Sequence, residues 1–259
     1  MDKLFYAGQY LSYRLKAGNA HDIHSPFVYD LYNNVINDHT PYYGYDLIES
    51  VRASQLISDE KINVIDYGTG KNNRKKRIST IAQSSVKPAK YAQLLFRLIN
   101  HFSTEHILEM GTSLGITTLY LSLANIKNHV ITLEGSPETA EVAIKNFKRL
   151  KRDNIELICG EFDETLPLAL EKLKRIDLIY FDGNHRKENT LSYFNKCLQY
   201  KTDNSVFVFD DIHWSREMHA AWEEIKKNES VTISIDLFQL GIIFFRKGLP
   251  KQHFTLKFN

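Results

Sequence analysis

Two stretches of this chain combine an apolar run with an acidic residue and closely spaced glycines. One is VIDYGTG at residues 64–70, and the other is ILEMGTSLG at residues 107–115. Glycine lets the backbone approach a ligand without an intervening side chain, and the turn from a strand into a helix can bind a nucleotide. Either stretch could form such a loop, and its surroundings decide between them.

The second stretch has the surroundings that a nucleotide-binding loop requires. A strand should lead into the loop, a helix should follow it, and an acid about 20 residues later should meet the ribose hydroxyls. A helical pattern begins directly after Gly115, and Glu134 ends the next apolar run 19 residues beyond Gly115. We therefore expect the cofactor loop at 109–115 and Glu134 on the ribose.

The first stretch lacks these surroundings. The segment KNNRKKR at 71–77 follows it, with five cations in seven residues, and no acidic residue occurs between Asp66 and Glu105. We expect a solvated turn between domains at 66–77. The alternative is a mobile lid whose cations meet an anionic substrate or RNA phosphate.

Carboxylates and an imidazole follow two later apolar runs. Asp182 ends one run, Asp210 and Asp211 end the next, and His185 lies three residues after Asp182. The carboxyl ends of parallel strands meet at one edge of a sheet, where grouped carboxylates repel one another unless a cation or proton compensates. An imidazole near neutrality is suited to act as a general base, and His213 is a second candidate for that role.

The elements that must position these residues alternate regularly from about residue 88 onward. Apolar runs of strand length are separated by amphipathic helical patterns, which predicts a parallel sheet with helices on both faces. The last two runs, VTISIDLF and LGIIFFRK, are too close together for a crossover helix and must pair antiparallel. The segment HFTLKF could add an edge strand.

The N-terminal third has a different, mainly helical pattern. Ser25 and Pro26 predict a helix start in HSPFVYDLYNNVIND, and KINVIDYG predicts a short strand. We expect residues 1–87 to form a helical extension that covers the acceptor pocket, and residues 88–259 to form the cofactor-binding domain. Residues 40–46, TPYYGYD, could form a wall of that pocket or pack in the core of the extension.

Composition excludes several classes of protein. The chain has 259 residues, 43% of them hydrophobic, and a net charge of +2, so no strong field favours nucleic acid or a membrane. No apolar run approaches the roughly 18 residues of a membrane span. Cys159 and Cys197 lie in apolar runs and are expected to be buried thiols. We expect a cytoplasmic protein.

With these motifs the chain resembles the class I S-adenosylmethionine-dependent methyltransferases, and within them the O-methyltransferase branch of the catechol and caffeoyl-coenzyme A enzymes. The similar stretches are LEMGTSLGITT, VITLEGSPETAEVA, CGEFDETLP, LIYFDGNHRKENT and VFVFDDIHW. The resemblance implies an α/β fold with a Rossmann-like, doubly wound sheet of seven strands, mostly parallel with a C-terminal antiparallel hairpin.

The resemblance also implies the roles of individual residues. The implied cofactor-binding residues are Glu109, Gly111, Thr112, Ser113, Gly115, Glu134, Gly135, Glu161, Phe162, Asp163 and Asp182. His185 and Asp182 match catalytic positions. Asp182 and Asp210 match two metal-ligand aspartates, whereas Asp211 stands where that branch has an asparagine. The resemblance thus implies S-adenosylmethionine and leaves open Mg²⁺ or another divalent cation; without metal, these aspartates would orient loops or the cofactor's amino group.

The function implied is S-adenosylmethionine-dependent O-methylation of a small hydroxylated acceptor, of which an aromatic compound is one example. The alternatives are N-methylation and methylation of RNA or protein. Nucleic acid is the less expected substrate, because an NPPY-type motif is absent. A non-catalytic adenosine-binding protein would need Glu134 and the glycine loop but not Asp182, His185 and Asp210. A dehydrogenase is disfavoured by the C-terminal hairpin. A homodimer stays open, and no membrane partner is expected.

Overall fold

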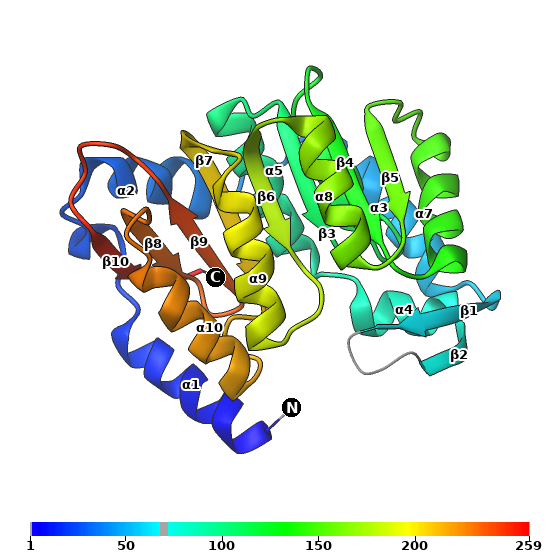
Figure 1. Cartoon of the computed structure of the whole chain (residues 1–259), viewed down its shortest axis with the longest axis horizontal. Coiled ribbons are helices and arrows are strands. Elements are labelled where there is room, and N and C mark those ends of the chain that lie inside the picture. The colour runs from blue at the N-terminus through cyan, green and yellow to red at the C-terminus, as the bar shows by residue number, and fades with distance from the viewer. Residues whose placement is uncertain (1, 68–71, 259) are drawn as a thin grey trace. The chain divides into compact units, whose positions relative to one another are not determined.

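The computed structural model describes residues 2–67 and 72–258 (Figure 1). Contacts within the chain divide it into two compact units. The central unit comprises residues 40–174, and the terminal unit comprises residues 1–39 and 175–259. The predicted boundary between residues 87 and 88 does not coincide with this division, and the two domains expected from the sequence stay a prediction.

The central unit alternates helices and strands after an initial helix and a short ribbon. Its elements are α3 (Gly44–Leu56), β1 (Lys61–Asp66), β2 (Asn72–Arg77), α4 (Ile78–Ser85), α5 (Ala89–Phe102), β3 (His106–Met110), α6 (Ile116–Leu123), β4 (His129–Glu134), α7 (Pro137–Arg149), β5 (Ile155–Cys159) and α8 (Phe162–Leu173). Strand β4 pairs in parallel with both β3 and β5. Their order in the unit is β3-β4-β5, and their parallel pairing is the one that the alternating pattern predicts.

Strands β1 and β2 form a separate antiparallel ribbon. The strand predicted in KINVIDYG is confirmed, whereas the solvated turn expected at 66–77 is wrong for residues 72–77, which form β2. The ribbon tolerates the cations of β2 because Arg74, Lys75 and Arg77 are exposed to solvent. Gly68 and Gly70 of the first glycine stretch lie outside the described residues.

The terminal unit combines both ends of the chain. Its elements are α1 (Lys3–Lys16), η1 (Ala20–Asp22), α2 (Pro26–Leu31), η2 (Tyr32–Ile36), β6 (Ile176–Phe181), α9 (Lys187–Leu198), β7 (Lys201–Asp210), α10 (Arg216–Lys227), β8 (Ile233–Asp236), β9 (Leu240–Phe244) and β10 (Gln252–Thr255). The strand order is β10-β8-β9-β7-β6. Strand β6 is parallel to β7, while β9 runs antiparallel to both β7 and β8. The predicted α/β class, the mostly parallel pairing, the C-terminal hairpin and the edge strand are therefore confirmed.

The first helix belongs to the terminal unit because it packs on the C-terminal part of the chain. Figure 1 shows α1 beside α10, and the Phe5 and His219 rings are 6.1 Å apart. The Tyr13 hydroxyl donates to the Leu256 carbonyl at 2.7 Å, and Gly18 forms an isolated bridge with Leu256. The N-terminal residues thus help to form the same core as the last strands.

Two expectations about single side chains need revision. Cys159 is exposed, because it ends β5, whose pairing in the central unit is with β4 alone; Cys197 is buried as expected. In the segment 40–46, Tyr42 and Tyr45 both pack on Phe96. For these two rings the structure therefore agrees with packing in the core, the second of the two alternatives. Among the described residues, no helix has the length and apolar character needed to cross a membrane.

Candidate functional site

The second glycine stretch forms the tight connection from β3 to α6. Gly111, Ser113 and Gly115 have positive φ angles of 107°, 49° and 83°. A Cβ atom at Gly115 would lie 2.6 Å from Cε1 of Phe147 on α7, so a larger residue fits neither the backbone angle nor the space. Glycine at 115 lets α6 begin against α7 and fixes where the loop ends.

Backbone hydrogen bonds hold this loop against its neighbours. The N–H groups of Gly111 and Thr112 both donate to the Leu133 carbonyl of β4, at 3.0 and 3.1 Å. The Leu114 carbonyl accepts from Gln55 Nε2 on α3 and from Asn146 Nδ2 on α7, each at 3.0 Å. The loop is therefore preorganised by three different elements, as a binding loop should be.

Glu134 lies directly beside the loop. Its Oε2 accepts from the Ser113 N–H at 2.8 Å, and its Oε1 accepts from the Ser136 N–H at 2.9 Å. A carboxylate offers about four acceptor positions, so two stay open for a vicinal diol. Burial raises the pKa of Glu134, and the N–H groups of Ser136, Ser113 and Gly135 oppose that rise. The residue chosen for the ribose is thus joined to the loop chosen for the cofactor.

Glu109 lies fully buried at the end of β3. Its Oε2 accepts from Thr118 Oγ1 at 2.5 Å and from Thr132 Oγ1 at 2.7 Å, while its Oε1 has no hydrogen-bond partner among the described residues. Burial raises the pKa of Glu109 to about 8. The charge of Glu134 also raises this pKa, whereas the hydrogen bonds from the two threonines lower it. A buried carboxyl oxygen without a partner marks a place for a ligand's donor or cation.

The segment after β5 reaches the same edge of the central unit. The Gly160 N–H donates to the Glu134 carbonyl at 2.9 Å. Glu161 then caps α8, and its carbonyl accepts from the Thr165 N–H at 2.9 Å. Glu161 and Phe162 are half-buried, whereas Asp163 is exposed. The central unit therefore brings together the loop, Glu134 and the beginning of α8, as the sequence predicts.

Three further residues at this edge were not predicted from the sequence. Thr118 and Thr132 hold Glu109, and Tyr67 packs so closely on Gly135 that a Cβ there would lie 2.7 Å from Tyr67 Cδ2. Thr132 had a usable signal, since a lone hydroxyl in the apolar run HVITLEG needs a partner. Tyr67 had none, because its contact joins segments that are far apart in the chain.

In the terminal unit, the predicted base lies close to its predicted acid. His185 Nε2 is 3.7 Å from Asp182 Oδ1, and these two side chains are 30% and 21% exposed. The Tyr180 hydroxyl donates to Asp182 Oδ2 at 3.2 Å. The Asp182 carboxylate therefore lies within ion-pair distance of the imidazole.

Asp210 ends β7 and is buried, and its Oδ1 accepts from the Asp211 N–H at 2.8 Å. Asp211 has a left-handed backbone with φ 53°, so the chain does bend between the two aspartates. Burial raises the pKa of the Tyr180 hydroxyl, and so do the charges of Asp182, Asp210 and Asp211 and a hydrogen bond to Asp210. A neutral phenol therefore lies among these carboxylates.

This arrangement does not fit a divalent cation. Within residues 2–67 and 72–258, no three His, Cys, Asp or Glu side chains form a group that could hold a metal ion. The Tyr180 hydroxyl already donates its one proton to Asp182, which was predicted to face an ion. The metal set of Asp182, Asp210 and Asp211 therefore stays a prediction that this geometry does not support.

His213, the second candidate base, is buried away from solvent. Its Nε2 lies 2.7 Å from Asp236 Oδ2, and its ring stacks on Phe238 and His219 at centroid distances of 5.3 and 5.1 Å. Phe238 is held at φ 71°, with its N–H donating to Asp236 Oδ1. The surroundings of His213 indicate a structural role in the core of the terminal unit.

Comparison with known proteins finds a similarity to methyltransferases. Residues 108–212, which contain the glycine loop, Glu134 and Asp182, match a family described as methyltransferase domain. This part of the chain is thus similar to a methyltransferase domain. Over 114 residues the chain is 27% identical to the O-methyltransferase imqG of Aspergillus flavus, covering 42% of this chain and 45% of that protein. Over 101 residues it is 34% identical to the transmembrane O-methyltransferase of Propithecus coquereli, covering 37% and 36%.

The chain thus matches less than half the length of these two relatives. A longer similarity exists to a solved structure, the O-methyltransferase from Bacillus cereus in complex with SAH. That similarity has a TM-score of 0.55 and 18% identity, and it covers 80% of this chain and 92% of that one. It shows the Rossmann-like fold that the motifs predict.

Proposed function

We propose that this protein is an S-adenosylmethionine-dependent O-methyltransferase that acts on a small hydroxylated acceptor. The observation that supports it most directly is the Glu134 carboxylate, which is tied to the glycine loop by Ser113 and to the start of α7 by Ser136. It keeps acceptor capacity for the two hydroxyls of a ribose. The SAH complex of the related Bacillus cereus enzyme is consistent with such a ligand.

The buried edge of the central unit also suits the rest of that cofactor. When bound, S-adenosylmethionine supplies an activated methyl group on a sulfonium. Glu109 presents a buried carboxyl oxygen without a partner among the described residues, which suits the ammonium or sulfonium end of such a molecule. We assign the adenine to Glu161 and Phe162, which follow Gly160 and are half-buried: the acid would accept from the adenine amine and the ring would pack on the base.

We assign proton transfer to His185, with Asp182 as the residue that orients it. A phenolic acceptor has a pKa of about 10 and must lose its proton as the methyl group arrives. An imidazole is a suitable acceptor for that proton, and the Asp182 carboxylate lies within ion-pair distance of it, at 3.7 Å. No step of this proposal runs through a metal, because the described residues contain no group of three His, Cys, Asp or Glu side chains that could hold one.

Two other functions stay as alternatives. An N-methyltransferase would use the same cofactor edge but would not need a base for a hydroxyl. A non-catalytic adenosine-binding protein would need Glu134 and the glycine loop and would have no use for His185 beside Asp182. The short distance within this pair favours an enzyme over a binding protein.

The test pairs two variants whose expected defects are opposite. Glu134→Ala should weaken the binding of S-adenosylhomocysteine (SAH), the cofactor product, more than about tenfold, because two charge-assisted hydrogen bonds to the ribose are lost. His185→Ala should keep that affinity within about twofold and lower turnover of a catechol-type probe by about 10²-fold or more. Isothermal titration calorimetry and a methyl-transfer assay measure the two quantities.

Each variant is the control for the other. Wild-type SAH affinity in Glu134→Ala would contradict the ribose assignment, and wild-type turnover in His185→Ala would contradict the assignment of the base. Failure of the wild-type protein to bind SAH at all would overturn the proposed function itself.

A further inference from the structure

The β1–β2 ribbon ends beside the residues proposed to bind the cofactor. We call these residues the cofactor edge: the loop 111–115, Glu134 with Gly135, and the start of α8. Tyr67 follows the last residue of β1, and its ring lies over Gly135, the residue after Glu134. A Cβ atom at Gly135 would lie 2.7 Å from Tyr67 Cδ2 and 2.9 Å from Tyr67 Cε2. The space that a side chain at 135 would fill is therefore filled by an aromatic ring from another part of the chain.

The ribbon is anchored to the segment that follows Glu134. The Asn63 N–H donates to Glu138 Oε2 at 2.7 Å, and Asn63 Nδ2 donates to Glu138 Oε1 at 2.5 Å. The Ile65 N–H donates to Ser136 Oγ at 3.3 Å, and that hydroxyl donates to the Asn63 carbonyl at 3.3 Å. These bonds fix β1 along the first turn of α7, one residue from Gly135.

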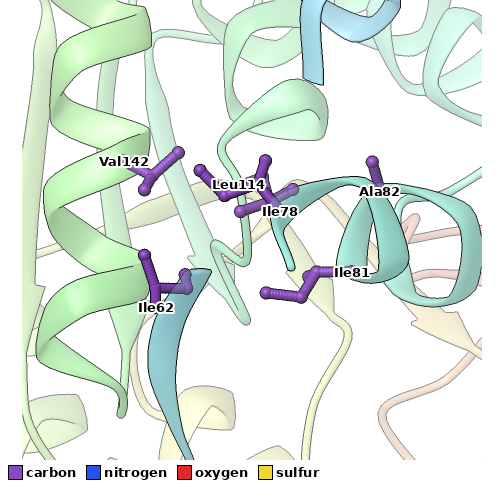
Figure 2. Packing of buried hydrophobic residues seen from close by; sticks show 6 residues of the cluster. All are labelled: Ile62, Ile78, Ile81, Ala82, Leu114 and Val142. Carbon is purple, nitrogen blue, oxygen red and sulfur yellow. The ribbon is translucent and has the colours of Figure 1, made fainter. Parts of the chain in front are cut away.

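Apolar packing fixes the ribbon to the glycine loop as well. Figure 2 shows a buried cluster that joins four elements and consists of Ile62 from β1, Ile78, Ile81 and Ala82 from α4, Leu114 from the loop and Val142 from α7. Leu114 lies between Ser113, which bonds to Glu134, and Gly115. The ribbon and its flanking segments thus contact the cofactor edge at two places. Tyr67, directly after β1, contacts Gly135, and the apolar side chains of β1 and α4 pack with Leu114.

We propose that Tyr67 is a cofactor-positioning residue whose ring packs on the adenosyl part of the bound cofactor. This inference rests on the proposed function. A ribose held by Glu134 brings its base within reach of position 135, where glycine offers no side chain and Tyr67 supplies the apolar surface instead. Base-on-ring packing is favourable with any adenosine compound, because it uses the face of the ring rather than its hydroxyl.

The geometry assigns different consequences to two changes at the same contact. Tyr67→Ala removes the ring and should weaken SAH binding by about tenfold. Tyr67→Phe keeps the ring and should stay within about twofold. Gly135→Ala should also weaken binding, because its Cβ would displace the ring. In a Tyr67→Ala background the Gly135→Ala change should cost less, since the ring that it displaces is gone.

The experiment is calorimetric titration of the full chain with SAH and, by competition, with adenosine and methionine. Tyr43→Ala is the matched control, because that tyrosine is 82% exposed in the same unit. We expect Tyr67→Ala to lose affinity for SAH and adenosine by the same factor and to leave methionine unchanged. In turnover it should raise KM for S-adenosylmethionine and keep kcat. Equal thermal unfolding midpoints of Tyr67→Ala and Tyr43→Ala would show that the loss of SAH affinity does not come from a loss of stability.

The proposal would be overturned if Tyr67→Ala bound SAH as tightly as the wild type or more tightly. Tighter binding would mean that the Tyr67 ring occupies the place of the ligand. Equal losses in Tyr67→Ala and Tyr67→Phe would also overturn it, since a hydroxyl and not the ring would then matter. In either case wild-type SAH binding would leave the proposed function standing. No binding of SAH by the wild type would overturn both.

Discussion

Glu109 lies in an environment unlike that of an exposed carboxylate. Its side chain is fully buried, two threonine hydroxyls donate to one oxygen, and the other oxygen has no partner among the described residues. Burial outweighs the two hydrogen bonds, so the pKa rises from 4.5 to about 8. At neutral pH the folded protein therefore favours the protonated form, and a cationic ligand end would favour loss of that proton.

This raised pKa predicts a pH dependence of stability. Since the folded pKa lies above the unfolded one, the contribution of Glu109 to stability is fully present below about pH 4.5 and is lost as pH rises through about 8. Glu109→Gln keeps the shape without the charge. We expect its free energy of unfolding to exceed that of the wild type at pH 8 by at least about 1.4 kcal/mol, the equivalent of one pKa unit, and to converge with it near pH 5.

Urea denaturation at a series of pH values measures that difference. Glu141→Gln, at an exposed position of α7, is the control and should give a profile parallel to the wild type. A parallel profile for Glu109→Gln would mean that Glu109 ionises normally in the folded protein.

The β1–β2 ribbon with α4 supports the cofactor loop. Its buried cluster includes Leu114, whose neighbours Ser113 and Gly115 set the conformation of the loop. Because packed interiors transmit strain, a cavity on the ribbon side of Leu114 should loosen the loop on its other side. The stability of the ribbon and the affinity for the cofactor should therefore change together.

Ile81→Ala tests that coupling. Ile81 is 5% exposed within the cluster, so truncation should lower the free energy of unfolding by about 2–4 kcal/mol. It should also weaken SAH binding several-fold, although we place Ile81 behind the loop and not against the ligand. Ile126→Ala is the control, since Ile126 is 95% exposed in the same unit. Loss of stability with unchanged SAH affinity would show that the ribbon supports the fold and not the loop.

Across the whole molecule, both ends of the chain contribute to one unit. Residues 1–39 cluster with residues 175–259, and the Tyr13 hydroxyl bonds to the Leu256 carbonyl. The central unit likewise includes α3 and the ribbon, which precede residue 88. Residues 1–87 thus complete two cores, and this pattern differs from that of a removable cap.

A fragment of residues 88–259 should therefore fail to fold cooperatively. It would lack Ile62, Ile78 and Ile81 around Leu114, and Tyr6 and Tyr13 around Phe238. We expect no near-ultraviolet circular dichroism and no sharp thermal transition. The full chain with Tyr13→Phe is the milder comparison and should lose only about 1 kcal/mol, the value of one hydrogen bond. Cooperative unfolding of the fragment at the midpoint of the full chain would instead support the boundary at 87/88.

The sequence by itself predicted the alternation of helices and strands from about residue 88 onward, and it favoured the loop at 109–115 for the cofactor. Periodicity, caps and the spacing from Gly115 to Glu134 are local properties, and the Ser113–Glu134 hydrogen bond agrees with them. The tertiary structure alone decided that Tyr67 lies on Gly135, that Tyr180 donates to Asp182, and that one oxygen of Glu109 is left without a partner among the described residues. The physical reason is that such contacts depend on how buried side chains fill space, and no local pattern encodes which distant side chain will fill it.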